Sequence, residues 1–211
     1  MILDVVAGNA SAQLKRSVAD SVVRRYLHRA LSLRDAGTAG HTHRVSVITE
    51  AIGVEMGCSP HEARALFVGS ILHDIGKLGT PDAVLQKNGL FDDRDRAIMR
   101  SHCQDGFEIL RGKVTHEAAM VALCHHERYD GTGYPSGMTA DEIPLGARVC
   151  SVADYFDAAT TEHGGRACLG AREAADEIAG RRGTWFDPAV VDAFLRAAAL
   201  KTFDAQPSGE T

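Results

Sequence analysis

The sequence predicts an all-α protein, a single helical bundle preceded by an N-terminal lead-in helix. Strand signals are almost absent, because no stretch of alternating β-branched residues lies between turn signals. Helix signals recur throughout the chain. Residues 59–62, Ser-Pro-His-Glu, form a capping box with proline at the first helical position, and the apolar residues Ala65, Leu66 and Gly69 follow it. These observations favour a bundle over any fold built on a sheet.

The helices can be placed in order along the chain. In the lead-in, Val18, Val22 and Leu31 recur among charged residues, and the last helix opens at Asp187-Pro188. The other bounds come from the apolar periodicity, and the helices are expected at residues 11–34, 41–56, 60–76, 92–110, 115–126, 144–160 and 171–181. We expect a lead-in over residues 1–36, a main domain over 37–204 and a disordered polar tail over 205–211.

Composition excludes several classes of protein. The 211 residues, 45% hydrophobic and 24% charged, suit one soluble domain. A net charge of −5 disfavours a nucleic-acid partner, and the longest apolar run, residues 118–124, is too short to cross a membrane. The five cysteines form no CxxC pair, and the N-terminus is a poor signal peptide. We therefore expect a cytoplasmic protein with no membrane or nucleic-acid partner.

Ten histidines direct attention to metal binding, and several of them lie in apolar surroundings. His73-Asp74 is flanked by apolar residues on both sides, and His125-His126 follows the apolar run at 118–124. Such polar pairs are costly to bury unless a divalent cation compensates them. His41 and His102 adjoin apolar helix faces, and Asp154 lies among small residues. Imidazole and carboxylate donors suit Fe(II), Mn(II), Zn(II), Co(II) or Ni(II).

A structural role is the alternative for each of these residues. A lone histidine on an apolar face is more often a hydrogen-bonded core residue than a ligand. Four histidines beside charged residues or helix caps are expected to be exposed non-ligands, and these are His28, His43, His61 and His116. Cys103 and Cys124 adjoin histidines, but neighbours on a helix point about 100° apart. We interpret both cysteines as small packing residues.

Two motifs identify a family. Residues 73–77, His-Asp-Ile-Gly-Lys, resemble the signature of the HD superfamily of metal-dependent phosphohydrolases, whose fold is a helical bundle. Residues 125–135 resemble the HHExxDGxGYP motif of its HD-GYP subfamily, and the resemblance covers about residues 38–195. It implies a cyclic di-GMP phosphodiesterase, which forms linear pGpG and can continue to GMP through attack by a metal-activated hydroxide.

The resemblance also implies roles for individual residues. One metal ion would be held by His41, His73, Asp74 and Asp154, and a second by Asp74, His102, His125 and His126. Gly37 stands where some members carry a glutamate for a third ion, so two divalent ions, Fe(II) or Mn(II), are expected. Asp74 and Lys77 would be the catalytic residues, with Lys77 reaching the phosphate. Glu127 and Asp157 are candidates for orienting an imidazole or for purely structural caps and ion pairs.

The chain departs from the family after Asp154. Family members carry an Arg-Pro-Tyr run with a second basic residue that grips the ligand, whereas this chain keeps only Arg166 and has His163 in place of an arginine. Losing one such contact weakens phosphate binding by roughly ten- to a hundredfold. Two alternatives therefore stay open: a phosphodiesterase for another cyclic dinucleotide such as cyclic GMP-AMP, or a weakly active or inactive binding module. In the family, the Gly133-Tyr134-Pro135 loop is associated with diguanylate cyclase partners, and the lead-in helix suggests a homodimer.

Overall fold

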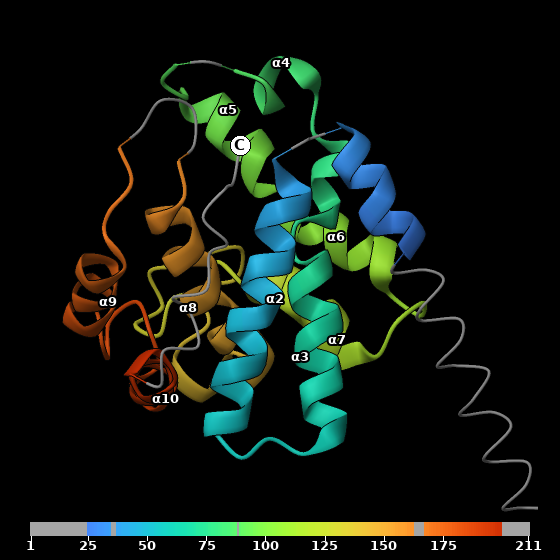
Figure 1. Cartoon of the computed structure of the whole chain (residues 1–211). Coiled ribbons are helices and arrows are strands. Elements are labelled where there is room, and N and C mark those ends of the chain that lie inside the picture. Colours follow the sequence, from blue (N-terminus) through green and yellow to red (C-terminus); the bar gives the residue numbers. More distant parts are fainter. Residues whose placement is uncertain (1–24, 35–36, 88, 163–166, 200–211) are drawn as a thin grey trace, which may run out of the picture.

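The computed structural model describes residues 25–34, 37–87, 89–162 and 167–199. These residues form an all-helical body (Figure 1) whose only β-structure is two isolated bridges. The elements are a helix over residues 25–34, α2 (Thr38–Glu55), α3 (Pro60–Leu72), η1 (Ile75–Gly79), α4 (Asp82–Leu85), α5 (Asp93–Arg100), α6 (His102–Leu110), α7 (His116–Cys124), η2 (Ala140–Glu142), α8 (Leu145–Thr160), α9 (Ala171–Gly180) and α10 (Pro188–Ala199). The all-α prediction is confirmed. None of the described helices has the length and apolar character needed to cross a bilayer.

The helices surround two apolar clusters. α2 and α3 lie side by side as an antiparallel pair, and α2 also packs against α8 and α10 (Figure 1). One cluster joins α2, α8, α9 and α10, with Ile52, Val149 and Phe194 fully buried. The other joins α3, η1, α6 and α7, with Leu72, Ile75 and Leu110 fully buried. Some of the predicted ligands come from helices of the first cluster and the others from helices of the second, so the site lies where the two groups of helices meet.

The helix at residue 60 begins as predicted but ends earlier. The Ser59 hydroxyl accepts a hydrogen bond from the Glu62 backbone N–H, and the Glu62 carboxylate accepts one from the Ser59 N–H. The predicted end at residue 76 is wrong, because α3 stops at Leu72. Asp74 leaves the α-helical region with φ −94° and ψ 7°, and the chain continues as the 3₁₀ turn η1. This break turns the Asp74 side chain toward α6.

Gly76 explains how closely η1 approaches α6. A Cβ atom at this position would collide with the backbone of His102 and Gly106. Only glycine therefore allows the two segments to touch, and their contact brings Asp74 next to the first residue of α6.

The single helix predicted over residues 92–110 is wrong, because it is divided at Ser101 into α5 and α6. The Ser101 hydroxyl lies 2.9 Å from the Ile98 carbonyl oxygen and 3.0 Å from the Asp105 carboxylate. Serine side chains that bond back to the preceding turn often bend a helix. No α5 residue is buried, whereas α6 buries His102, Cys103, Gly106 and Leu110. The division lets α6 alone turn into the core.

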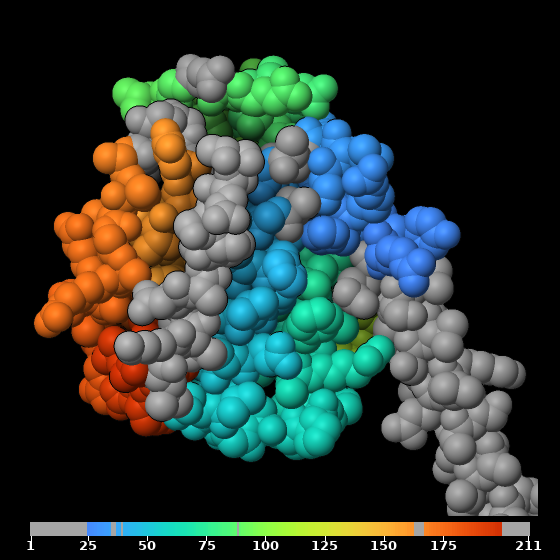
Figure 2. All heavy atoms as spheres, viewed as in Figure 1, coloured from blue at the N-terminus to red at the C-terminus, as the bar shows by residue number. Residues whose placement is uncertain are grey.

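The described part of the predicted lead-in, residues 25–34, is helical and packs on the domain. Leu31 is fully buried against α3 and η1, and Figure 2 shows this segment in blue against the body of the protein. His28 was expected to be exposed, but it is half-buried and its Nε2 lies 2.8 Å from the Thr42 hydroxyl of α2. The rest of the lead-in and the tail at 205–211 lie outside the described residues, so the domain bounds stay a prediction.

Candidate metal centre

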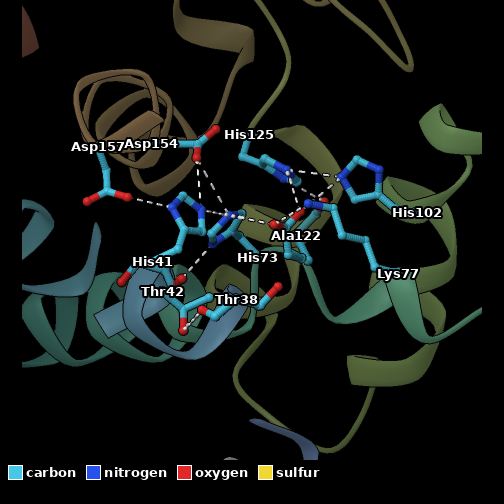
Figure 3. A network of polar contacts seen from close by, with 12 residues as sticks. Thr38, His41, Thr42, His73, Lys77, His102, Ala122, His125, Asp154 and Asp157 are labelled. Carbon is cyan, nitrogen blue, oxygen red and sulfur yellow. Dashed lines mark hydrogen bonds and ion pairs between the residues drawn. The ribbon is translucent and has the colours of Figure 1, made fainter. Parts of the chain in front are cut away.

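The structure brings together all the residues predicted to bind metal. They come from the first turn of α2, the junction of α3 and η1, the start of α6, the end of α7 and the middle of α8. Figure 3 shows most of them facing a common centre. The set consists of His41, His73, Asp74, His102, His125, His126 and Asp154.

Asp74 occupies the middle of this group. Its side chain is almost completely buried, with an exposed fraction of 5%. The Asp74 Oδ2 atom lies 3.3 Å from His73 Nε2, and Oδ1 lies 3.5 Å from His102 Nε2 and 4.0 Å from His125 Nε2. One carboxylate therefore faces three imidazoles from three different segments.

Three of these imidazoles are fixed in the same way. Each Nδ1 donates a hydrogen bond to the backbone carbonyl oxygen three residues earlier, which leaves Nε2 pointing into the cluster. The pairs are His73 with Ser70 at 2.7 Å, His102 with Met99 at 2.6 Å and His125 with Ala122 at 3.0 Å.

This arrangement fits a cation. His102 Nε2 and His125 Nε2 are only 3.2 Å apart, and the Asp74 carboxylate lies beside them. With both Nδ1 protons engaged elsewhere, two acceptor nitrogens face each other and an anion, which is unfavourable in a buried site. A divalent ion between these donors removes the repulsion and satisfies them together.

His41 is held from its far side. Its Nε2 atom lies 3.2 Å from Asp154 Oδ1, and its Nδ1 lies 2.7 Å from Asp157 Oδ2. Asp157 is buried and accepts two further hydrogen bonds from Arg44, from Nε at 2.5 Å and from Nη2 at 3.0 Å. The arginine fixes the carboxylate, and the carboxylate fixes the ring. These contacts support the orienting role that the sequence suggested for Asp157.

The charges divide the site into two parts. Burial lowers the pKa of His102 and His125, and it lowers that of His126 to about 4, so these imidazoles are neutral at pH 7. His41 behaves in the opposite way. Burial opposes its protonation, but hydrogen bonds to Asp154 and Asp157 raise its pKa to about 10. Without metal, the His41 ring is therefore protonated at pH 7, whereas the other three imidazoles are neutral.

The His41 proton predicts a pH dependence for metal uptake. A ligating imidazole must be neutral, so an ion bound at His41 has to displace one proton at any pH below about 10. Affinity at this position should rise about tenfold for each pH unit between about pH 6.5 and pH 8.5. Metal titrations followed by calorimetry in buffers of different ionisation enthalpy measure the released proton. A His41-side affinity that does not change with pH would contradict the assignment.

The loop after α7 covers the other side of the site. The Glu127 carboxylate accepts hydrogen bonds from the backbone N–H groups of Ser136 at 2.7 Å and Met138 at 3.2 Å. Glu127 therefore holds the loop through its backbone, and both of these hydrogen bonds are to loop N–H groups and not to an imidazole. The Tyr134 ring stacks on His126 with centroids 4.8 Å apart, and the Arg100 guanidinium lies 4.8 Å from the same tyrosine ring. The sequence did not predict either contact, because both depend on where the loop after α7 folds back over the site.

The stacking predicts a role for the Tyr134 ring in holding His126. Tyr134→Ala should weaken binding of the second metal by roughly ten- to a hundredfold, the usual cost of losing a group that orients a ligand. Tyr134→Phe keeps the ring and should bind metal like the wild type. Equilibrium dialysis with metal analysis measures both variants. Equal affinities for the alanine and phenylalanine variants would show that the ring does not position His126.

A cavity of about 540 Å³ opens over the site, and His41, Asp74, His126 and Asp154 are among its lining residues. Lys77 also lines it, with its Nζ atom 2.6 Å from Asp74 Oδ2. The predicted substrate contacts His163 and Arg166 lie outside the described residues.

Cys103 differs from its prediction as a packing residue pointing away from the ligands. Its Sγ lies 3.6 Å from His102 Nε2, and it forms one compact group of donor atoms with His102, His125 and His126. The helical angle between neighbours describes only the direction of Cβ, and the long imidazole of His102 carries its Nε2 back over Cys103. The other cysteine, Cys124, is buried with its Sγ 3.9 Å from Met138 Sδ, as a packing residue would be.

Comparisons with known proteins agree with this architecture. The HD domain family model matches residues 25–190. The cyclic di-GMP phosphodiesterase response regulator RpfG of Xanthomonas campestris is 38% identical over 176 residues, which cover 82% of this chain and 47% of that protein. The 3'3'-cGAMP-specific phosphodiesterase 2 of Vibrio cholerae is 33% identical over 172 residues, covering 80% of this chain and 33% of that protein.

A solved structure shares the fold. The cyclic GMP-AMP specific phosphodiesterase V-cGAP3 of V. cholerae superimposes with a TM-score of 0.65 at 23% identity, over 86% of this chain and 48% of that chain. The chain spans less than half the length of both curated relatives. With the family match over most of its length and the motif at residues 125–135, the chain belongs to the HD domain family of metal-dependent phosphohydrolases, in its HD-GYP group.

Proposed function

We propose that this chain is a cyclic dinucleotide phosphodiesterase that hydrolyses cyclic di-GMP to linear pGpG, with GMP as a further product. The observation that carries the proposal is the buried group of acceptor nitrogens around Asp74, which lies beneath a cavity that also contains Lys77. The relative named as a cyclic di-GMP phosphodiesterase supports the choice of substrate. A volume of about 540 Å³ lies within the usual range for small-molecule sites.

The donor set suits two divalent ions. We assign one to His41, His73, Asp74 and Asp154, and the other to Asp74, His102, His125 and His126. Gly37, at the position of the third-site glutamate, offers no side-chain donor. Nitrogen and oxygen donors are compatible with Fe(II) and Mn(II), our proposed ions. When bound, such ions activate water and stabilise the charge that builds on a phosphodiester under attack.

The protein's own residues would orient the substrate. Among the described residues that line the cavity, Lys77 is the one lysine or arginine. The Lys77 ammonium balances the negative charge of the Asp74 carboxylate. With cations bound beside Asp74, that charge would be neutralised by the metal, and Lys77 would be able to donate a hydrogen bond to a phosphate oxygen. A cyclic dinucleotide carries two phosphates, so the second needs another partner. Arg166 and His163 are our candidates, because Thr161 and Ala167, on either side of their segment, line the cavity.

Cyclic GMP-AMP is the second candidate substrate, because a relative of comparable identity is named for that specificity and because this chain lacks the Arg-Pro-Tyr run. A diguanylate cyclase partner at the Gly133-Tyr134-Pro135 loop, a homodimer through the lead-in and a cytoplasmic location stay predictions.

A substrate panel tests the proposed function. The purified chain, loaded anaerobically with Fe(II) or Mn(II), is given cyclic di-GMP, cyclic GMP-AMP and cyclic di-AMP in separate reactions, and products are separated by chromatography. We expect linear pGpG to appear fastest, with protein treated with a chelator as the control. Faster hydrolysis of cyclic GMP-AMP would transfer the assignment to the second candidate, and no hydrolysis of any of them would refute both.

A further inference from the structure

Cys103 adds a sulfur atom to a site whose other donors are nitrogen and oxygen. Its side chain is fully buried, and its Sγ belongs to a group with His102, His125 and His126 in which all donor atoms lie within 4.8 Å of one another. The ligands expected from the family resemblance include no cysteine. Burial explains a small apolar residue here, but it does not explain why the sulfur faces the nitrogens.

The distances match those between ligands of one ion. At a ligand–metal–ligand angle of about 109°, sulfur at about 2.3 Å and nitrogen at about 2.1 Å from one ion lie about 3.6 Å apart, and two such nitrogens lie about 3.4 Å apart. The Sγ of Cys103 lies 3.6 Å from His102 Nε2, and that Nε2 lies 3.2 Å from His125 Nε2. The donors are therefore already spaced for a shared ion.

We infer that Cys103 is an additional ligand of the second metal ion, beside Asp74, His102, His125 and His126, and that it makes this position prefer Zn(II) or Fe(II) over Mn(II). On binding, the S–H bond gives way to a sulfur–metal bond and the proton leaves to water. Thiolate is a soft donor, and Mn(II) favours oxygen donors. The inference rests on the metal centre proposed above and not on the substrate.

X-ray absorption of the zinc-loaded, untagged full chain tests the inference directly. We expect a zinc–sulfur distance of about 2.3 Å, with about one sulfur for every two zinc ions. The sulfur signal should vanish in Cys103→Ala and Cys103→Ser, the second of which keeps nearly the same side-chain volume. It should persist in the matched control Cys124→Ala, which removes a buried thiol that contacts Met138.

The wild-type spectrum decides the matter even if a variant fails to fold. A wild-type shell of nitrogen and oxygen alone would overturn the inference but leave the metal centre intact, whereas a chain without bound zinc would overturn both. Sulfur that persists in both Cys103 variants would also overturn it.

Metal competition tests the consequence for selectivity. When Zn(II) and Mn(II) compete for the chain, Cys103→Ser should lower the zinc preference at the second position by on the order of tenfold or more, because an oxygen donor replaces sulfur. Cys124→Ala should leave the preference unchanged. An unchanged preference in Cys103→Ser would refute the proposed effect of the thiolate.

Discussion

Replacing Asp74 with alanine is expected to remove metal from both positions and to lower turnover by at least about a thousandfold. Asp74 faces His73 through one oxygen and His102 and His125 through the other. Its loss therefore affects both proposed ions at once. A thousandfold loss corresponds to about 4 kcal/mol of transition-state stabilisation, the several kcal/mol expected when a metal site fails.

His41→Ala provides the comparison, because His41 belongs to one proposed position only. It should retain more metal than Asp74→Ala, and the control His43→Ala, on an exposed part of the same helix, should retain all of it. Elemental analysis after dialysis and initial rates with cyclic di-GMP measure these effects. An Asp74→Ala variant that still carries two ions would contradict the bridging role.

Replacing Lys77 with alanine is expected to lower turnover about a hundred- to a thousandfold without reducing metal content. The loss of one positioned donor to developing charge usually costs this much. Lys77 lies on η1, one residue past the tight contact of Gly76 with α6, so its Nζ is fixed beside Asp74. Lys77 is not a proposed metal ligand, and its removal leaves every proposed ligand in place. We therefore expect the metal content to stay unchanged.

Lys113→Ala is the matched control, since this exposed lysine donates a hydrogen bond to the Ile109 carbonyl oxygen near the end of α6 and does not line the cavity over the metal centre. Metal content and turnover are measured on the same preparations. If Lys77→Ala turned over cyclic di-GMP at the wild-type rate, Lys77 would be no more than a structural partner of Asp74.

The meeting of the predicted ligands could be expected from the sequence, because each of them lies within an apolar stretch or beside an apolar helix face. The capping box at Ser59 fixes where α3 begins, and an apolar face then carries the chain directly to His73. Burial of His73, His102 and His125 follows from such patterns, and all three are 1% exposed.

The helix ends that orient these residues depend in part on contacts between segments that are distant in the sequence. Periodicity alone continues α3 through Asp74 and joins α5 to α6 at Ser101. The structure ends α3 at Leu72, and Gly76 then lets η1 contact the backbone of α6. It divides α5 from α6 at Ser101, whose hydroxyl bonds back to the preceding turn. For the same reason the sequence did not reveal Cys103, whose role depends on where the His102 ring turns once α6 begins.

A metal titration coupled to hydrolysis shows whether the reaction depends on two bound ions. Metal-free protein is supplied anaerobically with Mn(II) or Fe(II) in steps up to two ions per chain, and the rate of linear pGpG formation is recorded at each step. We expect no hydrolysis without metal and full activity only as the second ion binds. Hydrolysis at an undiminished rate by metal-free protein, or cyclic di-GMP that stays intact when both positions are filled, would contradict the proposed two-metal phosphodiesterase.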